Sequence, residues 1–146
     1  MHTDYAARAL LALARNGDQY LSARRIAERE NIPYQFLRRI MGDLINSELI
    51  ESREGAGGGF RLTADPDAIR IVDLIKIFQG DLSLLECLVR GNPCSNRNTC
   101  VLRYEIKRIE KIVRDEFEAI TIGSLLNSSK SKGRQVRRPR VPSRKE

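Results

Sequence analysis

Residues 22–63 run SARRIAERENIPYQFLRRIMGDLINSELIESREGAGGGFRLT, and the order of patterns in this stretch decides the fold. Ser22 can cap a short helix over Ala23–Glu30, and a tight turn over Asn31–Pro33 leads into a longer helix from Pro33 to about Asn46. Two extended runs follow, Leu49–Arg53 and Phe60–Thr63, with a glycine-rich tip between them. A helix fits the DNA major groove, and a hairpin can lie along the adjacent backbone or minor groove. This order of elements therefore predicts a winged helix-turn-helix.

The flanking residues complete a mainly α fold. We expect helices over Thr3–Arg15, from Asp65 to about Gln79, and over Val101–Ile120. The last of these helices carries one narrow apolar stripe, made of Leu102, Ile106, Ile109, Val113, Phe117 and Ile120. So narrow a stripe suits a helix–helix seam, either within the domain or, as we favour, between two copies.

These patterns divide the chain into four segments. We predict a DNA-binding domain with a small β-hairpin wing over residues 1–80, a cysteine sensor loop over 81–100, a long C-terminal dimerisation helix over 101–127 and a disordered basic tail over 128–146. The tail holds eight Lys and Arg and one acidic residue, which accounts for the whole net charge of +7, because the other residues hold 18 basic and 18 acidic side chains. Any DNA-binding surface in the folded part must therefore come from local placement of charge.

Composition also limits the function. The chain has no stretch of about 18 apolar residues and no secretion-like N-terminus, so we expect no membrane association and a cytoplasmic location. Its only histidine, His2, is near the terminus, and the sequence has no phosphate-binding loop, Ser/His/Asp set or metalloprotease motif. We expect a protein that is not an enzyme.

Polar residues at the outward N-terminal end of the third helix are the candidates for reading DNA. They are Tyr34, Gln35, Arg38 and Arg39, and Arg53 and Arg61 flank the wing as phosphate contacts would. Arginine can bind guanine or phosphate, and glutamine can bind adenine. A charged helix face alone is common in proteins and is weak evidence. A glycine-rich wing directly after a helix-turn-helix is much less common, and this combination favours DNA binding.

The cysteines Cys87, Cys94 and Cys100 are separated by six and five residues. Three thiolates on one short loop can converge on a metal centre, and soft ligands favour an iron–sulfur cluster, zinc or copper. A cluster normally needs four ligands, and the sequence offers no fourth cysteine. A zinc site and a thiol switch without a cluster remain open.

The sequence resembles the Rrf-two (Rrf2) family of winged-helix regulators, in its IscR/NsrR-like branch, over about Thr3 to Leu126. The matching pieces are Thr3–Leu10, Ile32–Leu37, Gly57–Leu62, Ile71–Ile75 and the three-cysteine loop. The resemblance implies a homodimer on a palindromic site in double-stranded DNA, usually acting as a repressor. It also implies a [2Fe–2S] or [4Fe–4S] cluster on the cysteine loop.

The resemblance also bears on the fourth ligand. IscR-like members have a histidine three residues after the third cysteine, where this chain has Arg103. NsrR-like members use a carboxylate of a Thr-Asp motif from the partner subunit, and Thr3-Asp4 matches that motif. On sequence alone, Asp4 is equally a helix N-terminal residue favoured by the helix dipole. The wing departs from the family, since Glu54 stands where arginine usually precedes Gly55.

We therefore expect a sequence-specific transcription regulator that senses iron–sulfur, nitric oxide or redox status through Cys87, Cys94, Cys100 and Asp4. The alternatives are a cluster-free thiol or zinc redox regulator on the same scaffold, and a module whose helix-turn-helix docks on protein.

Overall fold

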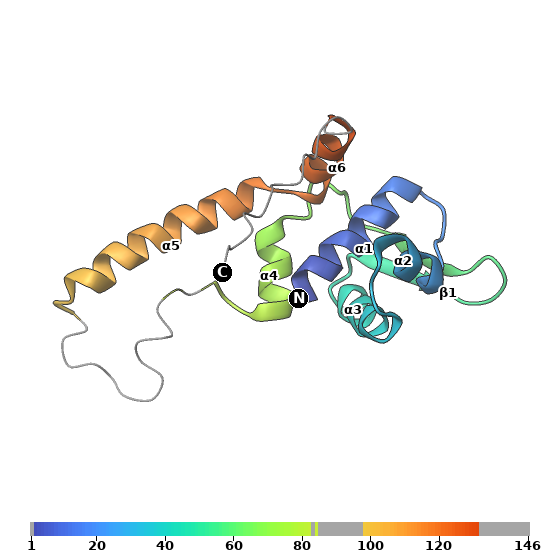
Figure 1. The fold of residues 1–146 in the computed structure, drawn as a ribbon, viewed down its shortest axis with the longest axis horizontal. Coiled ribbons are helices and arrows are strands. Elements are labelled where there is room, and N and C mark those ends of the chain that lie inside the picture. Colours follow the sequence, from blue (N-terminus) through green and yellow to red (C-terminus); the bar gives the residue numbers. More distant parts are fainter. Residues whose placement is uncertain (1, 83, 85–97, 132–146) are drawn as a thin grey trace, which may run out of the picture.

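The computed structural model describes residues 2–82, 84 and 98–131. Its elements, in chain order, are α1 (His2–Asn16), α2 (Ala23–Glu30), α3 (Tyr34–Asn46), β1 (Ile50–Arg53), β2 (Gly59–Leu62), α4 (Ile71–Gln79), α5 (Val101–Ala119) and α6 (Ile122–Ser131). A helix-turn-helix followed by a two-stranded antiparallel hairpin confirms the predicted winged helix-turn-helix (Figure 1). Among the described helices, none is long and apolar enough to cross a membrane.

Helix α1 is the element around which the domain is built. Helices α2, α3, α4 and α6 and strand β2 all pack against it. Its inward side is rich in alanine: Ala6, Ala9 and Ala12 have no exposed surface, and Leu10 and Leu13 are buried beside them. Small side chains let neighbouring elements approach closely, so α1 packs against the helix-turn-helix and also against α4 and α6.

The helix-turn-helix follows its local sequence signals closely. Ser22 caps α2 by accepting a hydrogen bond from the Arg25 N–H, and Asn31 ends the helix in the left-handed conformation with φ 51°. Ile26 and Ala27 then face the core from α2, and a buried row on α3 meets them, made of Leu37, Ile40, Met41 and Leu44. Burial of this row leaves the opposite side of α3 to solvent.

The hairpin is joined to the chain segment in front of α2. Leu21 and Phe60 exchange two backbone hydrogen bonds of 2.9 Å, which form an isolated antiparallel bridge beside the β1–β2 pair. Gly59 permits this approach, since it has φ +144° and a Cβ there would lie 2.4 Å from the Leu21 carbonyl oxygen. The second strand of the wing is therefore fixed to the residues just before the helix-turn-helix.

The predicted start of the fourth helix at Asp65 is wrong, because α4 begins at Ile71. The preceding residues pair with a distant segment. The Ile71 N–H donates to the Ile120 carbonyl and the Ile122 N–H donates to the Ile69 carbonyl, both at 2.9 Å. Because the backbone just before Ile71 is extended and paired in this bridge, the helix cannot begin earlier.

The C-terminal part also departs from expectation. Residues 101–127 form two helices rather than one, since α5 ends at Ala119 and α6 begins at Ile122, which is fully buried. Thr121 and Ser124 cap α6 with reciprocal side-chain to backbone hydrogen bonds of 3.0 Å. Residues 128–131, expected in the disordered tail, belong to α6. Residues 132–146 lie outside the described part of the chain.

Helix α5 stands apart from this core. None of its residues is buried, and α4 is the helix that packs against it. Figure 1 shows it extending away from the domain, on the side opposite the hairpin. Several of its large apolar side chains are exposed: Val101, Leu102, Tyr104, Ile109 and Ile112. An apolar surface of this kind is typical of a helix that packs against another chain.

We predict that Gly59→Ala lowers the free energy of unfolding by more than about 1 kcal/mol, because the new methyl group would need an unfavourable φ and would meet the Leu21 backbone. Gly42→Ala is the matched control. Gly42 lies in α3, and a methyl group added there would have no neighbouring atom within 4 Å, so alanine should add up to about 1 kcal/mol of stability. Urea unfolding midpoints measure both changes. Equal stability of the two variants would contradict the proposed junction.

Candidate nucleic-acid interface

The outward side of α3 presents the residues predicted to read DNA. Tyr34, Gln35, Arg38 and Arg39 are all exposed, while Leu37 between them is fully buried. Within the described part of the chain, neither arginine forms a side-chain hydrogen bond or an ion pair. Both guanidinium groups are therefore available to a ligand, with the buried row of α3 fixing the helix behind them.

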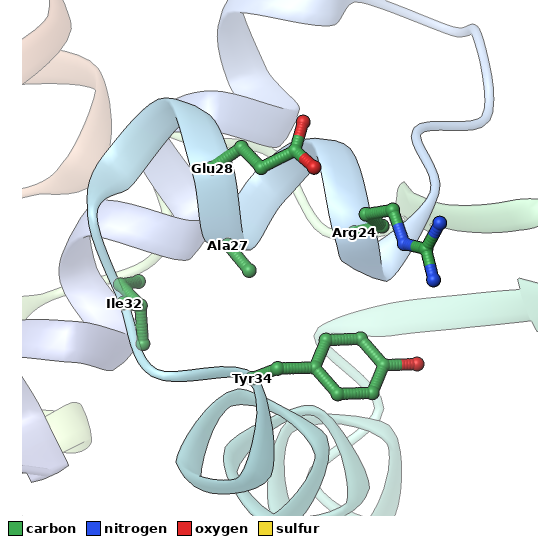
Figure 2. A pocket seen from close by; sticks show the side chains of 5 residues that line it. All are labelled: Arg24, Ala27, Glu28, Ile32 and Tyr34. Carbon is green, nitrogen blue, oxygen red and sulfur yellow. The ribbon is translucent and has the colours of Figure 1, made fainter.

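An open groove of about 470 Å³ lies between α2 and the start of α3 (Figure 2). It is lined by Arg24, Ala27, Glu28, Ile32 and Tyr34. Figure 2 shows the Arg24 guanidinium and the Tyr34 hydroxyl directed toward the same open side, with the Glu28 carboxylate directed away from Tyr34. The 49% exposed Tyr34 can therefore act together with Arg24 on one polar ligand.

Arg24 was not among the residues predicted from the sequence. The signal for it was present, because Arg24 is the second residue of α2, and in DNA-binding helix-turn-helix proteins this first helix crosses the DNA backbone.

The wing arginines lie in a compact polar cluster. Arg61 forms an ion pair with Glu51, with its Nε at 2.9 Å and its Nη2 at 2.6 Å from Glu51 Oε1. The same carboxylate accepts a hydrogen bond from the Tyr20 hydroxyl. The Arg53 guanidinium carbon lies 4.2 Å and that of Arg61 5.1 Å from the centre of the Tyr20 ring. The two arginines predicted as phosphate contacts therefore differ: within the described part of the chain, Arg61 pairs with a carboxylate and Arg53 does not.

The pKa values of this cluster follow from its hydrogen bonds. The Tyr20 hydroxyl, and then Arg61, lower the pKa of Glu51 by donating to its carboxylate. The bond to Glu51 raises the pKa of Tyr20 and that of Arg61 above their ordinary values. The carboxylate and the guanidinium thus stay charged together, and the cluster retains one net positive charge, on Arg53.

The structure describes two of the four predicted metal ligands. Cys87 and Cys94 lie outside the described residues. Cys100 is half-buried at the N-cap of α5, where its sulfur accepts a hydrogen bond from the Arg103 N–H at 3.4 Å. Backbone N–H groups commonly donate to metal-bound sulfur, so the Cys100 position suits a thiolate ligand.

Asp4 is an exposed residue in the first turn of α1, and its Oδ2 pairs with Arg8 at 3.1 Å. Arg8 also donates to the Glu30 carbonyl at the end of α2, at 2.7 Å. Figure 1 shows the start of α5 well apart from the chain's N-terminus, so the structure does not bring Asp4 and Cys100 together within one chain.

Comparison with known proteins gives a consistent result. Residues 1–128 match the model of the Rrf2 family, described as "Iron-dependent Transcriptional regulator". A putative HTH-type transcriptional regulator of Aquifex aeolicus is 33% identical over 125 residues, covering 84% of this chain and 87% of the relative. The HTH-type transcriptional repressor NsrR of Streptomyces coelicolor is 29% identical over 126 residues, covering 85% of this chain and 84% of the relative.

The fold also matches solved structures. The structure of CymR (YrzC), described as the global cysteine regulator of B. subtilis, superposes with a TM-score of 0.70 at 25% identity, covering 88% of this chain and 95% of that chain. The matched proteins are transcriptional regulators rather than enzymes, as the sequence predicts for this chain.

We predict that Glu51→Gln changes the pH dependence of stability. The pKa of Glu51 is below its ordinary value of 4.5 in the folded state, so its ion pair contributes stability above that pH and loses it as the pH falls through the lowered value. The stability difference between wild type and Glu51→Gln should be constant near neutral pH and shrink below about pH 4.5. Urea midpoints across this range measure it. Glu54→Gln removes a carboxylate at the exposed tip without touching the ion pair and is the control; identical profiles for both variants would contradict the assignment.

Proposed function

Because the chain belongs to the Rrf2 family of transcriptional regulators, we propose that it binds a palindromic operator in double-stranded DNA through the exposed side of α3 and the hairpin wing, and represses transcription there. The observation that carries this proposal is the exposed Arg38–Arg39 pair, free of partners among the described residues, on a helix whose other side is anchored in the core. Arginine side chains in that position can donate to guanine in the major groove or to phosphates. Arg24 and Tyr34 add donors from the neighbouring groove.

The operator is bound by a homodimer in this proposal. A palindromic site presents two half-sites about 34–36 Å apart, and one chain has a single recognition helix. Helix α5 supplies the surface for a second copy, since it has 19 residues, none of them buried, and exposed large apolar side chains between Val101 and Ile112. Pairing of two such helices would remove this apolar surface from water and set the distance between the two α3 helices.

Regulation comes from an iron–sulfur cluster in this proposal. Cys87, Cys94 and Cys100 would hold it, with the Asp4 carboxylate of a second copy as the fourth ligand. The cluster supplies chemistry that responds to iron supply, redox state and nitric oxide. The chain's own part is to hold three thiolates between α4 and α5, with the Arg103 N–H donating to one of them, so that ligand loss would affect the helix at the dimer seam.

Two observations favour a second candidate, a zinc or thiol switch without a cluster. Arg103 stands where IscR-like proteins have a histidine ligand, and Asp4 already pairs with Arg8. An absorption spectrum after anaerobic purification separates the two. A visible band with matching iron and sulfide supports the cluster, and a protein that stays colourless after reconstitution supports zinc or thiols.

We predict that Arg38→Ala weakens binding to an operator selected from a random duplex library by about 1–3 kcal/mol, because one base-reading side chain is lost. Loss should be specific, so binding to unrelated duplex should change less. Arg70→Ala is the control, because this exposed arginine pairs with Asp73 at the start of α4, outside α3, the wing and α5. Unchanged operator binding by the Arg38/Arg39 double alanine variant would show that another surface binds DNA. Failure of the wild type to enrich any sequence would favour a protein-docking module.

We predict that Cys94→Ala and the reconstituted wild type differ at least about tenfold in operator affinity under anaerobic conditions, which corresponds to about 1.4 kcal/mol. Fluorescence anisotropy on the same operator measures the difference. Equal affinities in every state would contradict regulation by this loop, even if a cluster is present. Asp4→Ala tests the fourth ligand, and an unchanged visible spectrum would exclude Asp4 from the site.

A further inference from the structure

Tyr20 makes contacts that neither the helix-turn-helix nor the sensor loop requires. It lies in the connection between α1 and α2, and its ring lies beside two arginines that come from two different strands. Arg53 is the last residue of β1 and Arg61 lies within β2. One aromatic side chain thus joins the connection to both strands of the wing.

The backbone around Tyr20 makes this ring a fixed platform. The next residue, Leu21, exchanges two 2.9 Å backbone hydrogen bonds with Phe60 of β2, and the one after that, Ser22, caps α2. The Tyr20 hydroxyl is held by Glu51 on β1. The ring therefore cannot move independently of the hairpin or of the helix-turn-helix.

The charges of the cluster separate the roles of its two arginines. The Arg61 guanidinium contacts Glu51 through two nitrogens, Nε and Nη2. It therefore has little freedom to reach a ligand. Arg53 is exposed, lies against the ring at 4.2 Å and donates from Nη2 to the Gly57 carbonyl at 3.1 Å. A stacked guanidinium keeps its in-plane N–H groups, and those not used by Gly57 can bind a phosphate oxygen.

We propose that Tyr20 is a positioning residue for DNA backbone binding: its ring holds the guanidinium of Arg53 ready for a phosphate, while the Glu51–Arg61 pair anchors the wing and does not contact DNA. This inference rests on the proposed DNA-binding function of α3 and the wing. Its physical basis is that a side chain already held in its bound orientation loses less conformational freedom on binding.

A double-mutant cycle tests the positioning role, with affinity measured on the selected operator. Tyr20→Phe keeps the ring and should bind within about twofold of wild type, whereas Tyr20→Leu should bind about two- to tenfold more weakly, because Arg53 must then be ordered on binding. Arg53→Lys keeps the charge but loses the planar stack and should weaken binding to a similar extent. In the Tyr20→Leu background, Arg53→Lys should add little further loss, because the platform is already gone.

The salt dependence of binding tests the assignment of the two arginines. Arg53→Gln should reduce the slope of log affinity against log salt by about 0.9, the value for one phosphate contact. The double variant Glu51→Gln/Arg61→Gln keeps the cluster's net charge and should leave this slope unchanged. A melting curve will show whether Tyr20→Leu folds. Because the variants at Glu51, Arg53 and Arg61 keep Tyr20, they test which arginine contacts phosphate even if Tyr20→Leu does not fold.

Three results would overturn the inference. They are full additivity of Tyr20→Leu and Arg53→Lys, an equal loss for Tyr20→Phe and Tyr20→Leu, and a slope reduced by the Glu51/Arg61 pair but not by Arg53→Gln. Each of them leaves wild-type binding intact and so leaves the proposed function standing. A wild-type protein that binds no duplex would instead contradict the proposed function, and this inference with it.

Discussion

Burial of the alanine-rich side of α1 is the constraint on which the rest of the structure depends. Ala6, Ala9 and Ala12 have no exposed surface, and five other elements pack on this one helix. Larger side chains there would push those elements apart, and overpacking of such sites costs about 1–3 kcal/mol each. Because α3 and α6 both lie on α1, the second helix of the helix-turn-helix and the last helix of the fold share one rigid support.

The second constraint concerns charge. Residues 1–127 carry no net charge, so their attraction to DNA depends on which charged groups are paired and which are free. Arg61 and Glu51 neutralise each other, and Asp4 pairs with Arg8. Arg38 and Arg39 on α3 have no such partner in the part of the chain that the structure describes. In our interpretation the surface for DNA arises from this selective pairing rather than from an excess of basic residues.

Local signals were enough to predict the helix-turn-helix, and the bounds of α2 agree with those expected because Ser22 and Asn31 mark its two ends. The late start of α4 could not be predicted, since it results from backbone bonds between Ile69–Ile71 and Ile120–Ile122, which no local pattern indicates. The Thr121–Ser124 cap was a readable signal for α6 that we missed. The role of Tyr20 depends on tertiary contacts with the wing, so the sequence alone offered no reason to choose it.

The claim that α3 and the wing together form a symmetric DNA-binding surface is tested most directly by a hydroxyl-radical footprint of the wild-type protein on its selected operator. We expect two symmetry-related blocks of backbone protection about 34–36 Å apart, each extending into the neighbouring minor groove where the wing lies. A single block of protection would contradict the dimeric arrangement. Uniform weak protection along the whole duplex would contradict specific binding by α3 and the wing.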